Sequence, residues 1–318
     1  MDCPITAKYQ ARLARFSVPN QHRILQYLAC LVAQQCADTT LVAVVNTLTM
    51  LGRQLTGECD EVLTADLTQT TAQDISAFIM AAQTSGLAPS TINTKVGLLA
   101  GFFEYLREEG QMTQQPVLRR RHRLLTPLVL PKPIPDADLA AFFHVIDAVR
   151  DRLIFLFMLR CGLRVSEVCA LTWDAIDLHA GTVRINRGKG QVDRVVYLSP
   201  DVEQALQVWR AHHAPSLYLF PGPKRHRAHL FRSQINVLMD QYLAAAGVTR
   251  HYSPHCLRHT FATHLLNAGV SLEILKELMG HYSIQLTLRY AQLYDTTKKH
   301  QYDKAMAQIA QRQALSGR

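Results

Sequence analysis

Cationic side chains that can bind a phosphate group occur at defined places in the second half of the chain. Arg164 lies two residues after a glycine in the run from Cys161 to Val168, CGLRVSEV, which predicts the start of a helix. A guanidinium there can donate two parallel hydrogen bonds to one phosphate. Lys189 lies between two glycines in a predicted hairpin turn, where little backbone bulk separates its ammonium group from a ligand. By itself, each residue is more typical of a solvated surface.

Two histidines, a second arginine and a tyrosine follow. His255 and Arg258 are three residues apart at the predicted start of a helix, so we expect them on one face. His281 follows a glycine that ends another predicted helix, and Tyr290 lies nine residues after it. A tyrosine, with a pKa near 10, becomes a nucleophile when cations stabilise its phenolate and another group accepts its proton. In isolation, Tyr290 is more typical of a packing residue.

Phosphodiester cleavage needs these side-chain types together. It requires a nucleophile, cations at the non-bridging oxygens where charge develops, and an acid for the leaving oxygen. The spacing from His281 favours Tyr290 over the neighbouring tyrosines, and no serine of the set lies in a recognisable nucleophile elbow. The weaker candidates for the nucleophile are Tyr282, Tyr294, Ser166 and Ser253.

Histidines also gather around position 250, which raises the alternative of a zinc site. The thiolates and carboxylates that accompany histidine in such sites are missing at the required spacing around His226, His229, His251 and His255. The seven cysteines are scattered and form no C-x-x-C pair, which is typical of reduced thiols. We therefore expect no metal, no cofactor and a cytoplasmic location.

The composition indicates a folded protein with a polyanionic partner. The 318 residues suffice for two domains that each bury a core, and 48% of them are hydrophobic against 19% charged. The net charge of +9 favours nucleic acid as the partner. Apolar runs remain far shorter than the roughly 20 residues that span a bilayer, so we expect no membrane partner.

The elements that must position these residues form two domains. Helical periodicity over residues 21–106, with apolar stripes from Ile24 to Leu31 and from Ile92 to Leu106, predicts an all-helical domain over residues 1–115. Residues 134–318 are expected to form the domain that carries the chemistry, mainly α with a small antiparallel β-sheet. Its predicted helices include 152–160, 163–171, 261–266 and 272–279, and its predicted strands are 182–186 and 194–198.

A basic, proline-rich stretch over residues 116–133 is predicted to link the two domains. Prolines favour extended chain, and five adjacent basic residues keep the segment solvated. Such a run repels itself unless an anion is near, so a strap across DNA phosphates is favoured over a simple spacer. The expected DNA contacts are Arg119, Arg120, Arg121, Arg123 and, in the preceding helical region, Lys95.

The ordered set of motifs resembles the tyrosine recombinase family, also called lambda-integrase-like. The resemblance rests, in chain order, on Gly-Leu-Arg164-Val-Ser-Glu, Gly-Lys189-Gly, His255-x-x-Arg258-His, Gly-His281 and Tyr290. The run RHTFATHLLNAGV, which begins at Arg258, is similar to the Xer-type and transposon-encoded members. The resemblance covers residues 130–293 and, more loosely, residues 90–106, which are similar to the family's core-binding domain.

The resemblance implies a mechanism without a cofactor. Tyr290 would attack the phosphate to give a 3′-phosphotyrosyl link and a free 5′-hydroxyl, and this covalent link would conserve the bond energy for rejoining. The other implied roles are a phosphate clamp for Arg164 and Arg258, acid for Lys189, proton transfer and phosphate binding for His255 and His281, and orientation of the site for Glu167.

The resemblance also implies an assembly. The two domains would form a C-shaped clamp around double-stranded DNA, and a homotetramer on paired sites would exchange strands through a Holliday junction. The tail from residue 296 would pack on a neighbouring protomer, and a second recombinase or an accessory protein is a further partner to consider. The task would be integration, excision or resolution of mobile DNA.

Two other functions compete with recombination. One is a DNA-binding accessory protein without catalysis, against which the intact set of catalytic positions speaks. The other is a type IB topoisomerase-like activity, which shares the chemistry. The Xer-like spacing and the helical amino-terminal domain favour recombination over relaxation.

Overall fold

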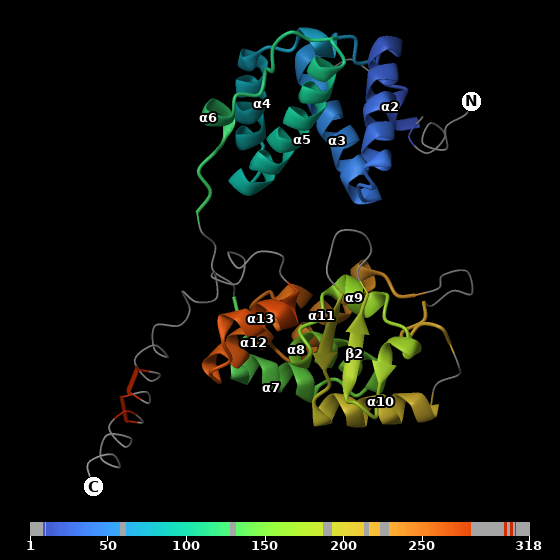
Figure 1. Ribbon diagram of the computed structural model, residues 1–318, viewed down its shortest axis with the longest axis vertical. Helices are drawn as coiled ribbons and strands as arrows, with labels where there is room; N and C mark the ends of the chain where they lie inside the picture. The colour runs from blue at the N-terminus through green and yellow to red at the C-terminus, as the bar shows by residue number, and fades with distance from the viewer. Residues whose placement is uncertain are drawn as a thin grey trace. The chain divides into compact units, whose positions relative to one another are not determined.

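The structure is a computed structural model that describes residues 9, 11–57, 62–127, 132–186, 193–212, 216–222, 229–280 and, further on, 302, 303, 306, 307 and 309. The chain divides into two compact units, Met1–Leu128 and Val129–Arg318, which are described separately (Figure 1). Helices predominate in both units. Within the described residues, no helix combines the length and the apolar character needed to cross a membrane.

The first unit is a helical bundle. Its longer described helices are α2 (Val18–Ala33), α3 (Asp38–Thr56), α4 (Ala72–Thr84) and α5 (Pro89–Glu108), with a 3-10 turn at Leu67–Gln69 before α4. Helix α5 packs against α2, α3 and α4, as Figure 1 shows. The two predicted apolar stripes are confirmed, since their residues are buried in a single core: Ile24, Tyr27, Leu28 and Leu31 of α2, and Ile92, Val96, Leu99, Phe102, Phe103 and Leu106 of α5.

The basic segment differs from the extended linker that its prolines predicted. Arg119–His122 forms the short helix α6, which packs against α4. Val117 and His122 are buried. Asn93 Nδ2 donates to the Leu124 carbonyl at 2.8 Å, and Asn93 Oδ1 accepts from the Leu124 amide at 2.9 Å. The packing of the first unit therefore continues past residue 115, because these tertiary contacts outweigh the local preference of the prolines.

Helix α8 (Val149–Arg160) is the centre of the second unit. Every residue from Leu153 to Leu159 is buried, as expected for a helix that is apolar all round. Helices α9, α10 and α12 all contact it. The helices of this unit are α7 (Asp136–His144), α8, α9 (Val165–Cys169), α10 (Pro200–His212), α11 (Arg232–Ala245), α12 (Pro254–Asn267) and α13 (Leu272–Met279).

A three-stranded antiparallel sheet completes the second unit. Its order is β1-β2-β3, with β1 at Ile176–Asp177, β2 at Thr182–Ile185 and β3 at Arg194–Tyr197. The two predicted strands are confirmed, and the short β1 was not predicted. The turn predicted around Lys189 lies outside the described residues. Val183 pairs with Val196, and both are buried, so one face of the hairpin joins the core.

Candidate active site

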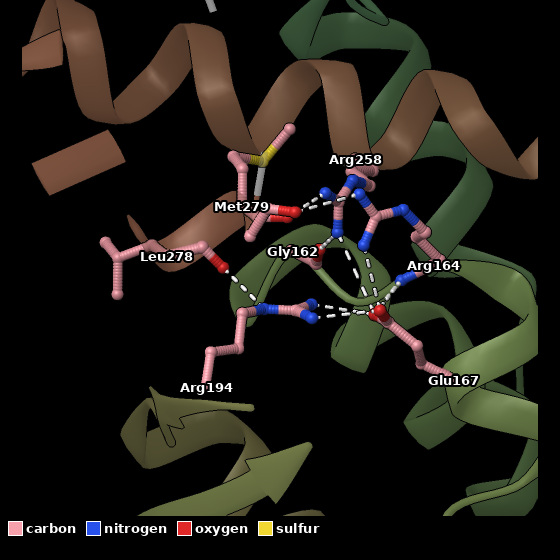
Figure 2. A network of polar contacts seen from close by, with 8 residues as sticks. Gly162, Arg164, Glu167, Arg194, Arg258, Leu278 and Met279 are labelled. Carbon is pink, nitrogen blue, oxygen red and sulfur yellow. Dashed lines mark hydrogen bonds and ion pairs between the residues drawn. The ribbon is translucent and has the colours of Figure 1, made fainter. Parts of the chain in front are cut away.

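Three arginine side chains of the second unit converge on Glu167 (Figure 2). The Glu167 carboxylate accepts from Arg164 Nη1 at 2.9 Å, and from Arg194 Nη1 and Nη2 at 2.9 and 2.7 Å. Its Oε2 lies 3.9 Å from Arg258 Nη1. One carboxylate among three guanidiniums leaves the cluster positively charged, which is the electrostatic requirement for binding a phosphate.

Arg164 is placed by the way helix α9 begins. The predicted helix over residues 163–171 is shorter, because Arg164 is extended and occupies the N-cap of α9. Its backbone amide donates to Glu167 Oε2 at 2.8 Å, so the same carboxylate binds both the backbone and the guanidinium of Arg164. The Arg164 side chain is 28% exposed, against 5% for Arg194 and 4% for Arg258. Arg164 is therefore the guanidinium of the cluster that is most open to solvent.

Arg258 lies in α12 and reaches across to the end of α8. Its guanidinium donates to the carbonyls of Gly162 and Met279. Gly162 has φ of +65°, and a Cβ built on it would meet the ring of Phe261 at 2.4 Å. Glycine is therefore required before Arg164 for two reasons, the left-handed backbone and the close approach of α12.

The end of α13 is held by the same three arginines. Gly280 has φ of +56° and ends the helix in the left-handed conformation, as the glycine there predicted. Carbonyls at a helix C-terminus carry partial negative charge, which favours guanidinium donors. The three hydrogen bonds run from Arg194 to the Leu278 carbonyl at 2.8 Å, from Arg258 to that of Met279, and from Arg164 to that of Gly280 at 3.3 Å.

The carboxyl group of Glu167 has opposing influences on its pKa. Burial raises the pKa, since the side chain is 11% exposed. The hydrogen bonds and charge of Arg194, the backbone amide of Arg164 and the charge of Arg258 lower it, and these effects prevail. Glu167 is therefore ionised at neutral pH.

His255 lies near the arginine cluster at the start of α12. Its pKa is lowered by desolvation of the ring and by the positive charges of Arg258, Arg164 and Arg232. A lowered pKa leaves the imidazole neutral at pH 7, so that it can accept a proton. His255 is exposed at the start of α12, three residues before the buried Arg258, and its role in the site stays a prediction.

Three of the predicted catalytic residues are not described. Lys189, His281 and Tyr290 lie outside the described residues and stay predictions. His281 follows Gly280 directly in the chain, and Lys189 lies five residues before Arg194. The described part of the site therefore comprises Arg164, Glu167, His255 and Arg258, together with Arg194.

Arg194 is the member of the cluster that the sequence did not lead us to predict. It stands at the start of β3 on the same face as Val196, and both side chains are buried. An arginine on the apolar face of an alternating strand is the signal that could have drawn attention to it, because such a charge must find a partner.

The predicted DNA contacts lie in the first unit. Arg119, Arg120, Arg121 and Arg123 are exposed, whereas Lys95 is half-buried. Among the described residues of the whole chain, His, Cys, Asp and Glu side chains form no group of three that could hold a metal ion.

Comparison with known proteins gives matches in both sequence and fold. The model of the phage integrase family matches residues 135–297. A tyrosine recombinase XerA from Pyrococcus furiosus is 32% identical over 236 residues, which is 72% of this chain and 78% of the relative.

Solved structures of two integrases share the fold. The Tn1549 transposon integrase in complex with a circular intermediate DNA superposes with a TM-score of 0.68 at 19% identity, over 84% of this chain and 94% of that one. A lambda integrase tetramer bound to a Holliday junction gives 0.66 at 19% identity, over 89% and 82% of the two chains. The mainly helical fold with a small antiparallel sheet is therefore one that integrases adopt.

Proposed function

This chain belongs to the phage integrase family of tyrosine recombinases, which cleave and rejoin DNA, and we propose that Tyr290 is the nucleophile. Tyr290 attacks a phosphate of a specific DNA site, a bond forms between the phenol oxygen and phosphorus, and the bond to the 5′-oxygen breaks. The products are a 3′-phosphotyrosyl link and a free 5′-hydroxyl. Attack by a 5′-hydroxyl reverses the step and rejoins the strand, so that no cofactor is consumed.

The convergence of Arg164 and Arg258 on Glu167 carries this proposal. Two guanidiniums from distant parts of the chain lie together beside a carboxylate that fixes their orientation. Guanidiniums bind the paired oxygens of a phosphate, and their charge stabilises the additional negative charge of the transition state. Arg164, which is partly exposed, and Arg258, which is deeply buried, are assigned to the two non-bridging oxygens.

Proton transfer is assigned to three residues. Neutral His255 accepts the phenolic proton of Tyr290 or holds the phosphate, and its lowered pKa supports this role. Lys189 donates a proton to the leaving 5′-oxygen, and His281 assists by binding the phosphate. The positions of Lys189 and His281 in the sequence motifs support their assignment.

Double-stranded DNA is the proposed partner. The net charge of +9 and the exposed arginines 119–121 and 123 support phosphate contacts by the first unit. The solved Tn1549 integrase is bound to a circular intermediate DNA, and the lambda integrase tetramer to a Holliday junction. By analogy, four protomers act on paired sites and exchange strands through such a junction, to integrate, excise or resolve mobile DNA.

Covalent capture tests the proposal. The protein is incubated with a library of nicked duplexes that carry randomised sequence, and adducts that survive denaturation are amplified to find the site. Duplexes of that site are then compared between wild type and Tyr290→Phe. We expect an adduct with wild type and none with the variant. Absence of any wild-type adduct would favour a DNA-binding accessory protein, and relaxation of a supercoiled plasmid without strand exchange would favour a topoisomerase-like activity.

A further inference from the structure

We propose that Arg194 is a positioning residue that neutralises Glu167 and thereby leaves the guanidiniums of Arg164 and Arg258 available to the DNA phosphate. The inference rests on the proposed function and adds a residue that acts on the phosphate only through other groups. Arg194 acts through Glu167 and through the end of α13.

The geometry of the Arg194–Glu167 pair differs from that of the pairs that Glu167 forms with Arg164 and Arg258. Arg194 uses both terminal nitrogens, one for each carboxylate oxygen, at 2.9 and 2.7 Å. Arg164 binds one oxygen with one side-chain nitrogen, and the Arg258 nitrogen is 3.9 Å from the carboxylate. A bidentate pair is the strongest geometry for a guanidinium and a carboxylate. Arg194 therefore takes the largest share of the Glu167 charge.

Burial and hydrogen bonding distinguish Arg194 from Arg164. The Arg194 side chain is 5% exposed and lies beside Glu167, which is 11% exposed. With its guanidinium divided between Glu167 and the Leu278 carbonyl, Arg194 is committed to protein acceptors. Arg164, at 28% exposed, is open to a ligand. Without Arg194, the buried carboxylate would draw Arg164 and Arg258 towards itself and away from a phosphate.

Arg194 also joins parts of the site that are distant in sequence. Its Nε donates to the Leu278 carbonyl at 2.8 Å, which connects the start of β3 with the end of α13. In the sequence, Lys189 lies five residues before the first residue of β3, and His281 follows α13 after a single glycine. The Arg194 guanidinium therefore links the start of β3 to the end of α13.

Substitutions that remove the positive charge of one arginine test the inference. Arg194→Gln is compared with Arg184→Gln, which removes an exposed arginine from the neighbouring strand β2. The measurements are single-turnover cleavage of the captured duplex, affinity for the same duplex, and the thermal midpoint of the full chain. We expect cleavage by Arg194→Gln to fall about 10- to 100-fold, as for a displaced catalytic group, with affinity changed much less. Arg184→Gln should match wild type, and Arg194→Lys should retain part of the rate.

The double variant Arg194→Gln/Glu167→Gln separates neutralisation from simple packing. If Arg194 neutralises Glu167, removal of both charges should restore cleavage above the level of Arg194→Gln alone. The defect of Arg194→Gln should also shrink on acidification, because protonation of Glu167 releases Arg164 and Arg258. Equal rates for Arg194→Gln and Arg184→Gln, or a double variant no faster than Arg194→Gln alone, would overturn the inference. Formation of the covalent adduct by the wild type in the same cleavage experiment shows that the proposed function holds independently of the inference.

Discussion

At the scale of single residues, the site depends on which groups are charged at neutral pH. Glu167 is kept ionised by Arg194, Arg164 and Arg258 despite its burial, and His255 is kept neutral by desolvation and by the neighbouring cations. The ionised carboxylate can orient the cations, and the neutral imidazole is free to accept a proton, and both functions assist phosphodiester cleavage.

The pH dependence of cleavage should report His255. Its pKa is lowered from 6.5, so the neutral form persists below that pH and is lost only as the pH falls through the lowered pKa. We therefore expect the acid limb of the single-turnover rate to have its midpoint below pH 6.5 in wild type. In His255→Gln this limb should disappear along with part of the rate. An acid limb above pH 6.5, or one unchanged in His255→Gln, would remove His255 from proton transfer.

The sequence motifs indicated several residues of the candidate site but not the contacts between them. Arg164, Glu167, His255 and Arg258 could be found because each stands at a fixed offset in a short motif. Arg194 could not be found in this way, because its role arises from contacts with Glu167 and Leu278, which are 27 and 84 residues away in the chain. No local pattern specifies that pairing.

At the scale of elements, helix ends and turns hold the site. The end of α8, the start of α9 and the end of α13 meet at the arginine cluster, and glycines at 162 and 280 allow the left-handed turns there. Apolar periodicity predicted α2, α5 and α13 well, since each buries one regular face. The two-residue strand β1 and helix α6 were missed, because both depend on neighbours rather than on local pattern.

Gly162→Ala tests the turn before Arg164. The substitution forces an alanine to φ of +65° and its Cβ against the Phe261 ring. We expect a loss of about 2–4 kcal/mol in the free energy of unfolding of the second unit, together with impaired cleavage. Gly247→Ala is the matched control, with φ of +68° and no atom within 4 Å of the added Cβ, and should cost only about 1 kcal/mol. Equal losses would mean that the contact with α12 is unimportant.

Helix α6 is fixed to the first unit by His122. Its Nδ1 accepts from the Leu118 amide at 3.0 Å, and its Nε2 lies 3.2 Å from Ser76 Oγ. Because Ser76 donates its own proton to the Ala72 carbonyl, Nε2 must be the donor to Ser76. The ring is thus satisfied in its neutral form, and protonation of Nδ1 would break the bond to Leu118. Burial and the charge of Arg121 accordingly lower the pKa of His122.

Acidification should therefore loosen α6. The pKa of His122 is lower folded than unfolded, so its stabilising contribution is present above pH 6.5 and is lost as the pH falls through the folded pKa. Hydrogen–deuterium exchange of residues 118–124, corrected for the intrinsic rate, should show less protection well below pH 6.5 than above it. His122→Gln should remove this dependence. Unchanged protection in wild type across that range would show that protonation of His122 does not loosen α6.

At the scale of the whole molecule, the chain consists of two compact units with a division at Leu128. The number of units could be anticipated from length and from the proline-rich stretch. The extent of the first unit could not, because the contact of Asn93 with Leu124 joins residues 31 positions apart. The basic residues of α6 are consequently presented on a packed surface rather than on free chain.

The salt dependence of the affinity for DNA measures the phosphate contacts of the basic residues of α6. Each phosphate contact contributes about −0.9 to the slope of log affinity against log salt. Changing Arg119, Arg120 and Arg121 to Gln should therefore make the slope shallower by about 2 to 3. The exposed Arg12, Arg15 and Arg53, changed to Gln together, remove the same charge from elsewhere in the first unit. The same slope change in both triple variants would show that α6 makes no phosphate contacts of its own.

The proposal depends above all on Tyr290 as the nucleophile, and the chemical identity of the adduct tests that assignment. The covalent complex is trapped on the nicked duplex, digested with protease and nuclease, and sequenced by mass spectrometry. We predict a nucleotide attached through its 3′-phosphate to the Tyr290 oxygen, in the peptide that contains Arg289 and Tyr290 or begins at Tyr290. A nucleotide on another residue, or one attached through a 5′-phosphate, would contradict it.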